Sequence, residues 1–159
     1  SGDNLRQAAE DRGVAGERIV LADKLPLDEH LARHRLADLF LDTFNYNAHT
    51  TASDALWAGL PLLTKAGNSF SARVGASLLT AVGLPELITE SDEEYENLAL
   101  KLAGDPEELG RLREKLATNI PSSPLFDSVG FTRHLETAYA EMYDRYLKGD
   151  APADIRISP

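Results

Sequence analysis

Cysteine is absent from the 159 residues, and this absence excludes disulfides, thiol nucleophiles and thiolate metal sites. The sequence also lacks any apolar run close to the ~20 residues that a membrane-spanning helix needs. Its polar start does not have the pattern of a signal peptide. We therefore expect a cytoplasmic protein with no membrane partner.

Basic residues are scarce as well. The 16 lysines and arginines stand against 26 aspartates and glutamates, which gives a formal net charge of −10. A protein that binds nucleic acid or an anionic membrane over a wide area needs a basic face, so we expect neither partner. The charge does not exclude a local pocket for phosphate.

Hydrophobic residues make up 43% of the sequence, which is enough for one domain with a sizeable core. We expect this domain over residues 1–148. The remaining residues, 149–159, contain prolines and show no hydrophobic periodicity, so we expect a tail there.

The stretch 39–65 predicts the unit around which the domain is organised. It begins with a short apolar run that indicates a buried strand, and a polar loop follows. Thr50 opens a predicted helix, for which Gly59 suits the C′ position and Pro61 prevents continuation. An apolar run from Leu62 predicts the next strand. The order strand, loop, helix, strand is typical of a parallel sheet and favours the α/β class.

Further elements are predicted on both sides of this unit. Ser91 and Asp105 have the spacing to acidic residues or to proline that is typical of helix N-caps. The predicted elements are a helix over 4–12, a strand over 19–21, a helix from Asp28 to Leu36, a helix over 69–82, a strand over 87–88, a helix over 91–103, a helix from Asp105 and a helix over 129–147.

The last predicted helix has an apolar face, because apolar residues recur along it at near-helical spacing. We favour ordinary packing of this face on the domain. The alternative is contact with a second domain absent from this sequence. The face consists of Phe131, Leu135, Tyr139, Met142 and Tyr146.

The start of the helix at Thr50 is a candidate anion site, because free backbone N–H groups and the positive end of the helix dipole meet there. The hydroxyls of Thr50 and Thr51 can add hydrogen bonds to phosphate oxygens, and Asp54 can accept hydrogen bonds from ribose hydroxyls. The spacing alone favours a simpler interpretation, in which Thr50 or Thr51 caps the helix and Asp54 complements its dipole, because helix caps are far commoner than phosphate sites.

The sequence of residues 42–61, DTFNYNAHTTASDALWAGLP, resembles the C-terminal catalytic half of the TPR-linked protein O-GlcNAc transferases. The segments 18–20, 29–33, 71–77 and 122–126 resemble that family in the same order, so the resemblance covers nearly the whole chain. It is therefore more specific than a single motif.

The resemblance implies a fold: the C-terminal, Rossmann-like half of a GT-B glycosyltransferase, with helices around a parallel sheet. About four strands are predicted, whereas a complete doubly wound domain usually has five or six. We therefore expect the first strands, the N-terminal catalytic half and the TPR repeats to lie upstream in a larger protein.

The resemblance also implies a function. We expect the UDP-sugar-binding half of an inverting glycosyltransferase, which in the intact enzyme transfers GlcNAc from UDP-GlcNAc to Ser or Thr of proteins. The sequence has no Asp-x-Asp motif, so we expect no metal and no cofactor. The family's catalytic groups have no match here, and this chain alone is expected to be inactive.

Residue roles follow from the resemblance. His49, Thr50, Thr51 and Asp54 are expected to bind the diphosphate and ribose. Two positions depart from the family: Leu27 replaces a lysine that contacts the nucleotide, and Tyr46 replaces a smaller residue near the sugar, so the sugar preference is open. The base is expected to be framed by Leu25, through its backbone, His30 and Arg33, and the donor sugar to lie near Tyr46 and Asn47.

Two alternatives belong to other classes. A phosphorylation-dependent receiver domain would use Asp42 at one strand end and Thr64 and Lys65 at another. It is disfavoured because the paired acids after a first strand are absent, and because Thr64 and Lys65 should end different strands. The other alternative is a family-like module that has lost catalysis and only binds.

Overall fold

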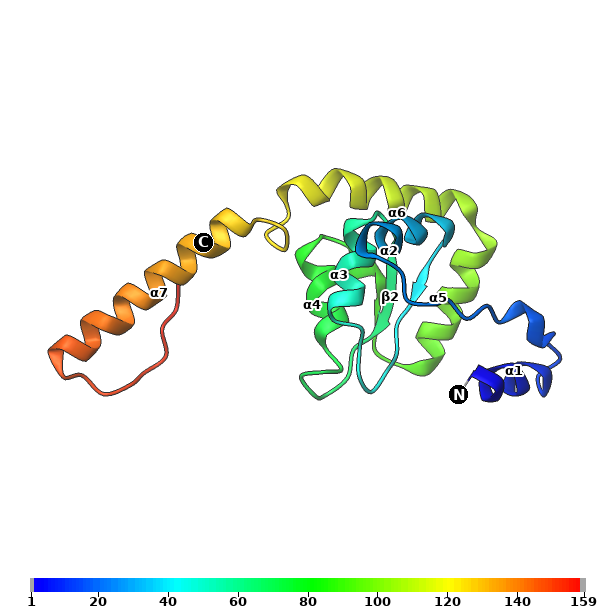
Figure 1. Ribbon diagram of the computed structural model, residues 1–159, viewed down its shortest axis with the longest axis horizontal. Coiled ribbons are helices and arrows are strands. Elements are labelled where there is room, and N and C mark those ends of the chain that lie inside the picture. Colours follow the sequence, from blue (N-terminus) through cyan, green and yellow to red (C-terminus); the bar gives the residue numbers. More distant parts are fainter. Residues whose placement is uncertain (1, 158–159) are drawn as a thin grey trace.

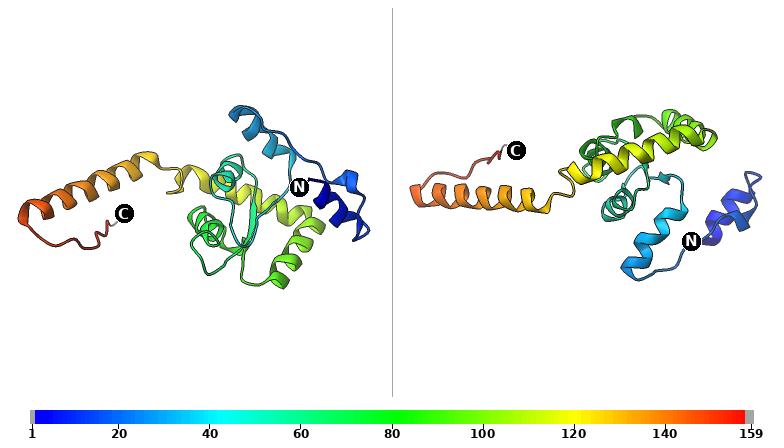
Figure 2. Two further views of the ribbon diagram at one scale, coloured as in Figure 1. Left: turned by 60° about the horizontal axis from the view of Figure 1, so that its bottom comes forward. Right: turned by 90° about the horizontal axis from the view of Figure 1, so that it is seen from above.

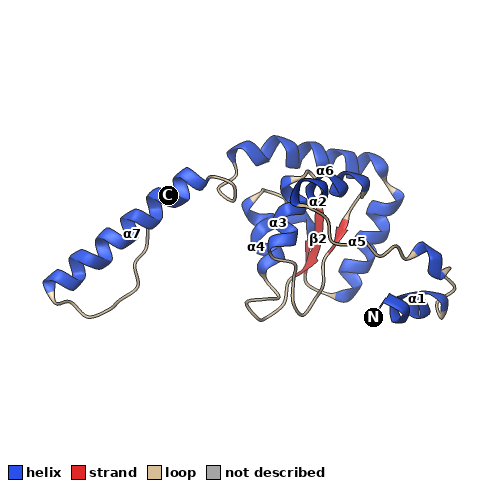
Figure 3. Ribbon diagram, viewed as in Figure 1, coloured by secondary structure: helices blue, strands red, loops and turns tan. Residues whose placement is uncertain are grey.

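Three short parallel strands lie at the centre of the molecule, and helices flank them (Figure 1, Figure 3). The computed structural model describes residues 2–157. Residues 158 and 159 of the predicted tail lie outside the described residues. The elements, in chain order, are α1 Gly2–Glu10, η1 Gly16–Arg18, α2 Leu27–Arg33, η2 His34–Leu36, β1 Phe40–Leu41, α3 Thr50–Trp57, β2 Leu62–Lys65, α4 Val74–Ala81, η3 Pro85–Leu87, β3 Ile88–Thr89, α5 Asp92–Gly104, α6 Pro106–Asn119, η4 Ile120–Ser122 and α7 Ser128–Lys148.

The sheet has the order β1-β2-β3, and both pairings are parallel. Phe40 pairs with Leu62, and Thr64 pairs with Ile88. Parallel neighbours need a crossover connection, which α3 supplies between β1 and β2 and α4 supplies between β2 and β3. The α/β class predicted from the sequence is confirmed.

The hydrophobic core surrounds the central strand. Leu62 and Leu63 of β2 are fully buried, and leucines of the flanking helices complete the packing. The continuous apolar run of β2 fits a strand that is covered on both faces. The buried members of the core cluster are Ala52, Leu56, Leu62, Leu79, Val82, Leu84, Leu87, Leu102, Leu112 and Leu116.

Helix α3 ends as predicted. Gly59 has φ +85°, in the left-handed region that favours glycine. Its N–H donates to the carbonyl of Leu56, and the N–H of Leu60 donates to that of Ala55. This pair of hydrogen bonds is a Schellman motif, which turns the chain sharply from α3 into β2.

The two predicted N-caps are also confirmed. The Ser91 hydroxyl accepts the Glu94 N–H at 3.1 Å, and the Asp105 carboxylate accepts the Glu108 N–H at 2.9 Å. These caps set the starts of α5, which packs on β2 and β3, and of α6, which packs against α5.

Several predicted boundaries were wrong. Residues 19–21 form no strand: they follow η1, no other strand of the described residues pairs with them, and Val20 is 84% exposed. The helix expected from Asp28 to Leu36 begins at Leu27, after the N-cap residue Pro26, and its last turn is the 3₁₀ helix η2. The helix expected from Ser69 begins at Val74, since residues 69–73 are taken up by tight turns.

The strands at the two edges also differ from the prediction. β1 is not fully buried, because it is an edge strand and Leu41 is 55% exposed. β3 begins at Ile88 rather than Leu87, because η3 occupies the preceding residues.

The packing that we favoured for the last helix is wrong. α7 projects away from the sheet, as Figure 1 and Figure 2 show, and it contains no buried residue. Contact of its apolar face with a second domain therefore stays a prediction. Phe131, Leu135, Tyr139, Met142 and Tyr146 are all exposed. Across residues 2–157, no helix combines the length and apolarity that crossing a membrane requires.

Two leucine-to-alanine variants test whether the core stabilises the domain while the apolar face of α7 does not. Leu116 is fully buried in the core, so Leu116→Ala is expected to lower the free energy of unfolding by about 2–5 kcal/mol. Leu135 lies on the unpacked face of α7, so Leu135→Ala is expected to change it by less than about 0.5 kcal/mol. Urea unfolding followed by circular dichroism measures both. Equal losses would mean that α7 packs on the domain in solution.

Candidate functional site

The candidate site lies at the carboxyl edge of the sheet. The loop after β1, residues 42–49, and the loop after β2, residues 66–73, extend side by side from this edge (Figure 1). A hydrogen bond of 2.9 Å from the Asn47 N–H to the Ser71 carbonyl joins them. Ligands of open α/β sheets bind outside the carboxyl ends of the strands, which is where these loops meet.

The start of α3 lacks a side-chain cap. His49 is the N-cap residue, and its side chain accepts no capping hydrogen bond. Thr50 and Thr51 are the first helical residues, and both are exposed. The simpler interpretation, in which one threonine caps the helix, is therefore wrong. The hydroxyls and the first N–H groups of α3 lie where an anion can approach them.

Helices α2 and α3 bring three predicted residues together. The Arg33 guanidinium donates to His30 Nδ1 at 2.7 Å, and His30 Nε2 lies 3.5 Å from Asp54 Oδ2. Arg33 also donates to the carbonyl of Asp23 at 2.8 Å, which fixes the extended segment before α2. His30 and Arg33, three residues apart in α2, thus lie on one face of that helix.

A groove of about 730 Å³ opens beside this cluster. His30, Arg33 and Leu27 of α2 form one wall, and the extended segment 22–26 forms the other. Leu25 and Leu27 both line the groove, so the residue that departs from the family pattern lies among the predicted base-binding residues.

Tyr46 and His49 of the first loop and Phe70 of the second form an aromatic cluster. The rings of Tyr46 and His49 are stacked, with centroids 4.8 Å apart, and Phe70 meets His49 edge-on at 6.0 Å. His49 Nε2 is buried and has no hydrogen-bond partner within the described part of the chain. Sequence reasoning missed Phe70, because nothing local marks it: only the folded loops bring it to His49.

Asn47 is placed differently from its neighbours. Its side chain is 1% exposed, donates to the Thr43 carbonyl at 2.7 Å and accepts the Gly75 N–H at 3.2 Å. The Asn47 side chain therefore stabilises the loop through buried hydrogen bonds to Thr43 and to α4, whereas Tyr46 beside it is exposed.

Tyr95 of α5 supports the loop from behind. Its hydroxyl donates to the backbone carbonyl of Asp42 at 3.0 Å. Burial of the phenol, and next the nearby Asp42 carboxylate, raise the pKa of Tyr95 to about 12. The hydroxyl thus stays protonated and keeps donating. Asp42 is itself 4% exposed, which makes it a poor phosphoacceptor and weakens the receiver interpretation.

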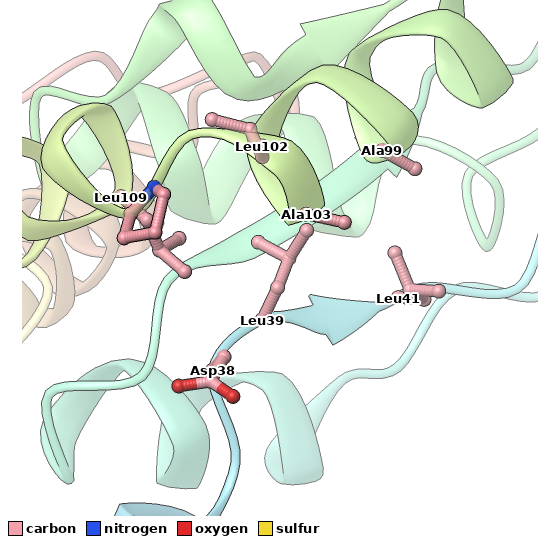
Figure 4. Close-up of a pocket in the computed structure, with 8 residues that line it drawn as sticks. Asp38, Leu39, Leu41, Ala99, Leu102, Ala103 and Leu109 are labelled. Atoms are coloured by element: carbon pink, nitrogen blue, oxygen red, sulfur yellow. The ribbon is translucent and has the colours of Figure 1, made fainter.

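A second groove, of about 520 Å³, lies along the open edge of β1 (Figure 4). Leu39, just before β1, points toward Ala103 of α5, and Leu41 of β1 points toward the side of α5 that carries Ala99. None of the predicted site residues lines this groove. Its lining is largely apolar, and it does not belong to the candidate site.

Metal ligands do not cluster in the part of the chain that the structure describes. No group of three or more histidine, aspartate or glutamate side chains could hold an ion there. The prediction that no metal is needed stays a prediction.

Comparisons with known proteins agree with this geometry. A protein from Hordeum vulgare, described as "Probable UDP-N-acetylglucosamine--peptide N-acetylglucosaminyltransferase SPINDLY", is 40% identical over 98% of this chain. The "UDP-N-acetylglucosamine--peptide N-acetylglucosaminyltransferase" of Caenorhabditis elegans is 36% identical over 92%. A solved structure of a Thermobaculum terrenum O-GlcNAc transferase mutant matches 89% of the chain with 41% identity and a TM-score of 0.81.

All of these proteins are much longer. This chain spans 17% of the Hordeum vulgare protein, 13% of the Caenorhabditis elegans protein and 27% of the chain in the solved structure. The model of glycosyl transferase family 41 matches residues 1–135. With this match, the parallel sheet and the close structural neighbour, the chain belongs to glycosyl transferase family 41.

Proposed function

We propose that this chain is the UDP-sugar-binding half of an inverting, metal-independent glycosyltransferase. In the intact enzyme, GlcNAc would pass from UDP-GlcNAc to a Ser or Thr hydroxyl of a protein. The observation that carries the proposal is the meeting of His30, Arg33 and Asp54 beside the uncapped start of α3. The descriptions of the relatives support the donor and the acceptor class.

The diphosphate would bind at the first turn of α3. Its charge would be offset by the N–H groups of that turn, by the helix dipole and by the hydroxyls of Thr50 and Thr51. Such preorganised dipoles stabilise the charge that develops on a leaving diphosphate without any metal ion. This local arrangement matters because the chain as a whole carries a net charge of −10.

The nucleoside would lie in the groove beside α2. An arginine can only donate hydrogen bonds, so His30 Nδ1 must accept from Arg33, and the proton of the neutral imidazole is then on Nε2. That N–H lies 3.5 Å from Asp54 Oδ2, and the other carboxylate oxygen would be left to accept from a ribose hydroxyl. His30 and Asp54 would thus connect the subsite for the base with the subsite for the ribose.

The catalytic groups and the acceptor site would be supplied by other parts of the intact protein, since no residue of this chain is assigned a catalytic role. The aromatic cluster of Tyr46, His49 and Phe70 would lie nearest the donor sugar. A family member that binds the donor without turnover is the second candidate. Sugar transfer by the full-length protein separates the two.

Titration with UDP tests the nucleotide site. The wild-type chain is expected to bind UDP, and Thr51→Ala and Asp54→Ala are each expected to weaken binding about tenfold or more, because each removes a hydrogen bond to a charged or ribose group. Isothermal calorimetry measures the affinity, and circular dichroism checks that each variant is folded. Thr137→Ala and Asp144→Ala, on exposed parts of α7, are matched controls that should bind like the wild type. No binding by the wild-type chain at millimolar UDP would contradict the proposal.

The metal prediction needs a separate comparison. The UDP affinity is expected to be the same in excess EDTA and in millimolar Mg²⁺, because the α3 site and not an ion offsets the diphosphate charge. A clear gain of affinity in Mg²⁺ that Asp54→Ala abolishes would instead make Asp54 a metal ligand.

The histidine tautomers test the geometry without any ligand. His30 is expected to carry its proton on Nε2, while His34, whose Nδ1 donates to the His30 carbonyl at 2.8 Å, carries it on Nδ1. Long-range proton–nitrogen correlation spectra at mildly alkaline pH distinguish the two forms. Arg33→Ala should shift the His30 ring toward a mixture of the Nδ1–H and Nε2–H tautomers and leave the tautomer of His34 unchanged. The same tautomer on both rings would refute the arrangement.

A further inference from the structure

Asp42 is buried directly behind the loop that leads to α3. One carboxylate oxygen, Oδ1, accepts the N–H of Thr43 at 2.9 Å and the N–H of Ala48 at 2.7 Å. Thr43 and Ala48 lie at the two ends of the loop, so a single oxygen closes it. The other oxygen, Oδ2, accepts the hydroxyl of Thr64 at 2.7 Å. The carboxylate therefore ties the end of β1, both ends of the loop and β2 together.

Helix α4 packs tightly against this carboxylate. A Cβ atom at Gly75 would lie 2.6 Å from Asp42 Oδ2 and 2.6 Å from the Thr64 hydroxyl, closer than real contacts allow. The Gly75 N–H also donates to the Asn47 side chain within the loop. Only glycine at this position lets α4 approach the end of β1.

Ala48 immediately precedes His49, the N-cap of α3. Fixing the Ala48 amide fixes the direction in which the chain enters the helix. It therefore fixes the orientation of the first-turn N–H groups and of Thr50 and Thr51. Binding groups held in place before the ligand arrives need no reorganisation when it binds.

We propose that Asp42 is a positioning residue for the diphosphate end of the site, acting through the Ala48 amide and never touching the ligand. The inference rests on the proposed function. The competing explanation is a contribution of Asp42 to overall stability alone. The two differ in their consequences for UDP affinity in a protein that remains folded.

Two substitutions at Asp42 separate hydrogen bonding from charge. Asp42→Ala removes the acceptors of Thr43, Ala48 and Thr64 together. Asp42→Asn keeps a carbonyl oxygen for the two amides, and its NH₂ group can donate to the Thr64 hydroxyl, which also accepts. Asparagine thus preserves the geometry while it removes the negative charge.

A third substitution perturbs the same carboxylate from another element. Gly75→Ala drives a methyl group into Asp42 and Thr64 without removing any hydrogen-bonding group. Its matched control is Gly110→Ala in α6, where an added Cβ meets nothing within 4 Å. Leu116→Ala is the control for lost stability, because it weakens the core away from the loop.

UDP affinity is measured by calorimetry on the whole chain, well below the melting temperature of every variant. Asp42→Ala and Gly75→Ala are expected to lose about tenfold or more in affinity, because small misplacements of binding groups are costly. Asp42→Asn, Gly110→Ala and Leu116→Ala are expected to stay within about threefold of the wild type, a difference below 1 kcal/mol. If Asp42 contributed only to stability, UDP affinity would not depend on which side chain stands at position 42 in a folded variant. Normal UDP affinity in Asp42→Asn together with weak affinity in Asp42→Ala therefore supports the positioning role.

The outcomes are distinguishable. If the wild type binds and Thr51→Ala weakens binding, but folded Asp42→Ala or Gly75→Ala binds normally, the positioning role is overturned and the proposed function stands. If Asp42→Asn loses as much affinity as Asp42→Ala, hydrogen-bonded positioning is overturned. If Asp42→Ala does not fold, Gly75→Ala and Asp42→Asn decide. Absence of wild-type binding overturns the proposed function and this inference with it.

Discussion

The parallel pairing of β1 with β2 is the constraint on which the rest of the structure depends. Because both strands run in the same direction, the loops that follow them leave the sheet at one edge and meet there. The same pairing forces a helical crossover, so α3 begins at that edge with its N–H groups directed outward. The place of the proposed site for an anion and a nucleoside thus follows from strand direction before any individual contact is considered.

Electrostatics within the site work against the charge of the whole chain. A net charge of −10 repels a diphosphate at long range, but salt screens this repulsion beyond about 10 Å. At contact distance in the proposed site, the dipole of α3 and its first-turn N–H groups would outweigh this repulsion. The buried Asp42 fits this division, because its carboxylate is engaged by three hydrogen bonds and serves to hold donors in place.

Two of the apolar surfaces in the described part of the chain are extended. The groove along the edge of β1 is lined by Leu39, Leu41 and Leu102, and α7 presents a face of aromatic and aliphatic side chains. Patches of this kind mark contact surfaces in soluble proteins. Since the chain spans only 13–27% of the relatives it matches, both surfaces are consistent with contacts inside a longer protein.

Local chemistry made part of this structure predictable from sequence. The α3 unit was predicted because glycine, proline and a short apolar run act within a few residues, and the caps at Ser91 and Asp105 were predicted for the same reason. The prediction of a strand at 19–21 was wrong because a strand forms only where a partner strand, distant in sequence, pairs with it.

The residues of the candidate site also differ in how far they could be predicted from local sequence. His30, Asp54 and the two threonines stand in readable motifs, whereas the contacts of Asp42 reach residues 22 and 53 positions away. The residues proposed to touch a ligand stand in a motif, whereas the residue proposed to position them becomes visible only in the folded chain.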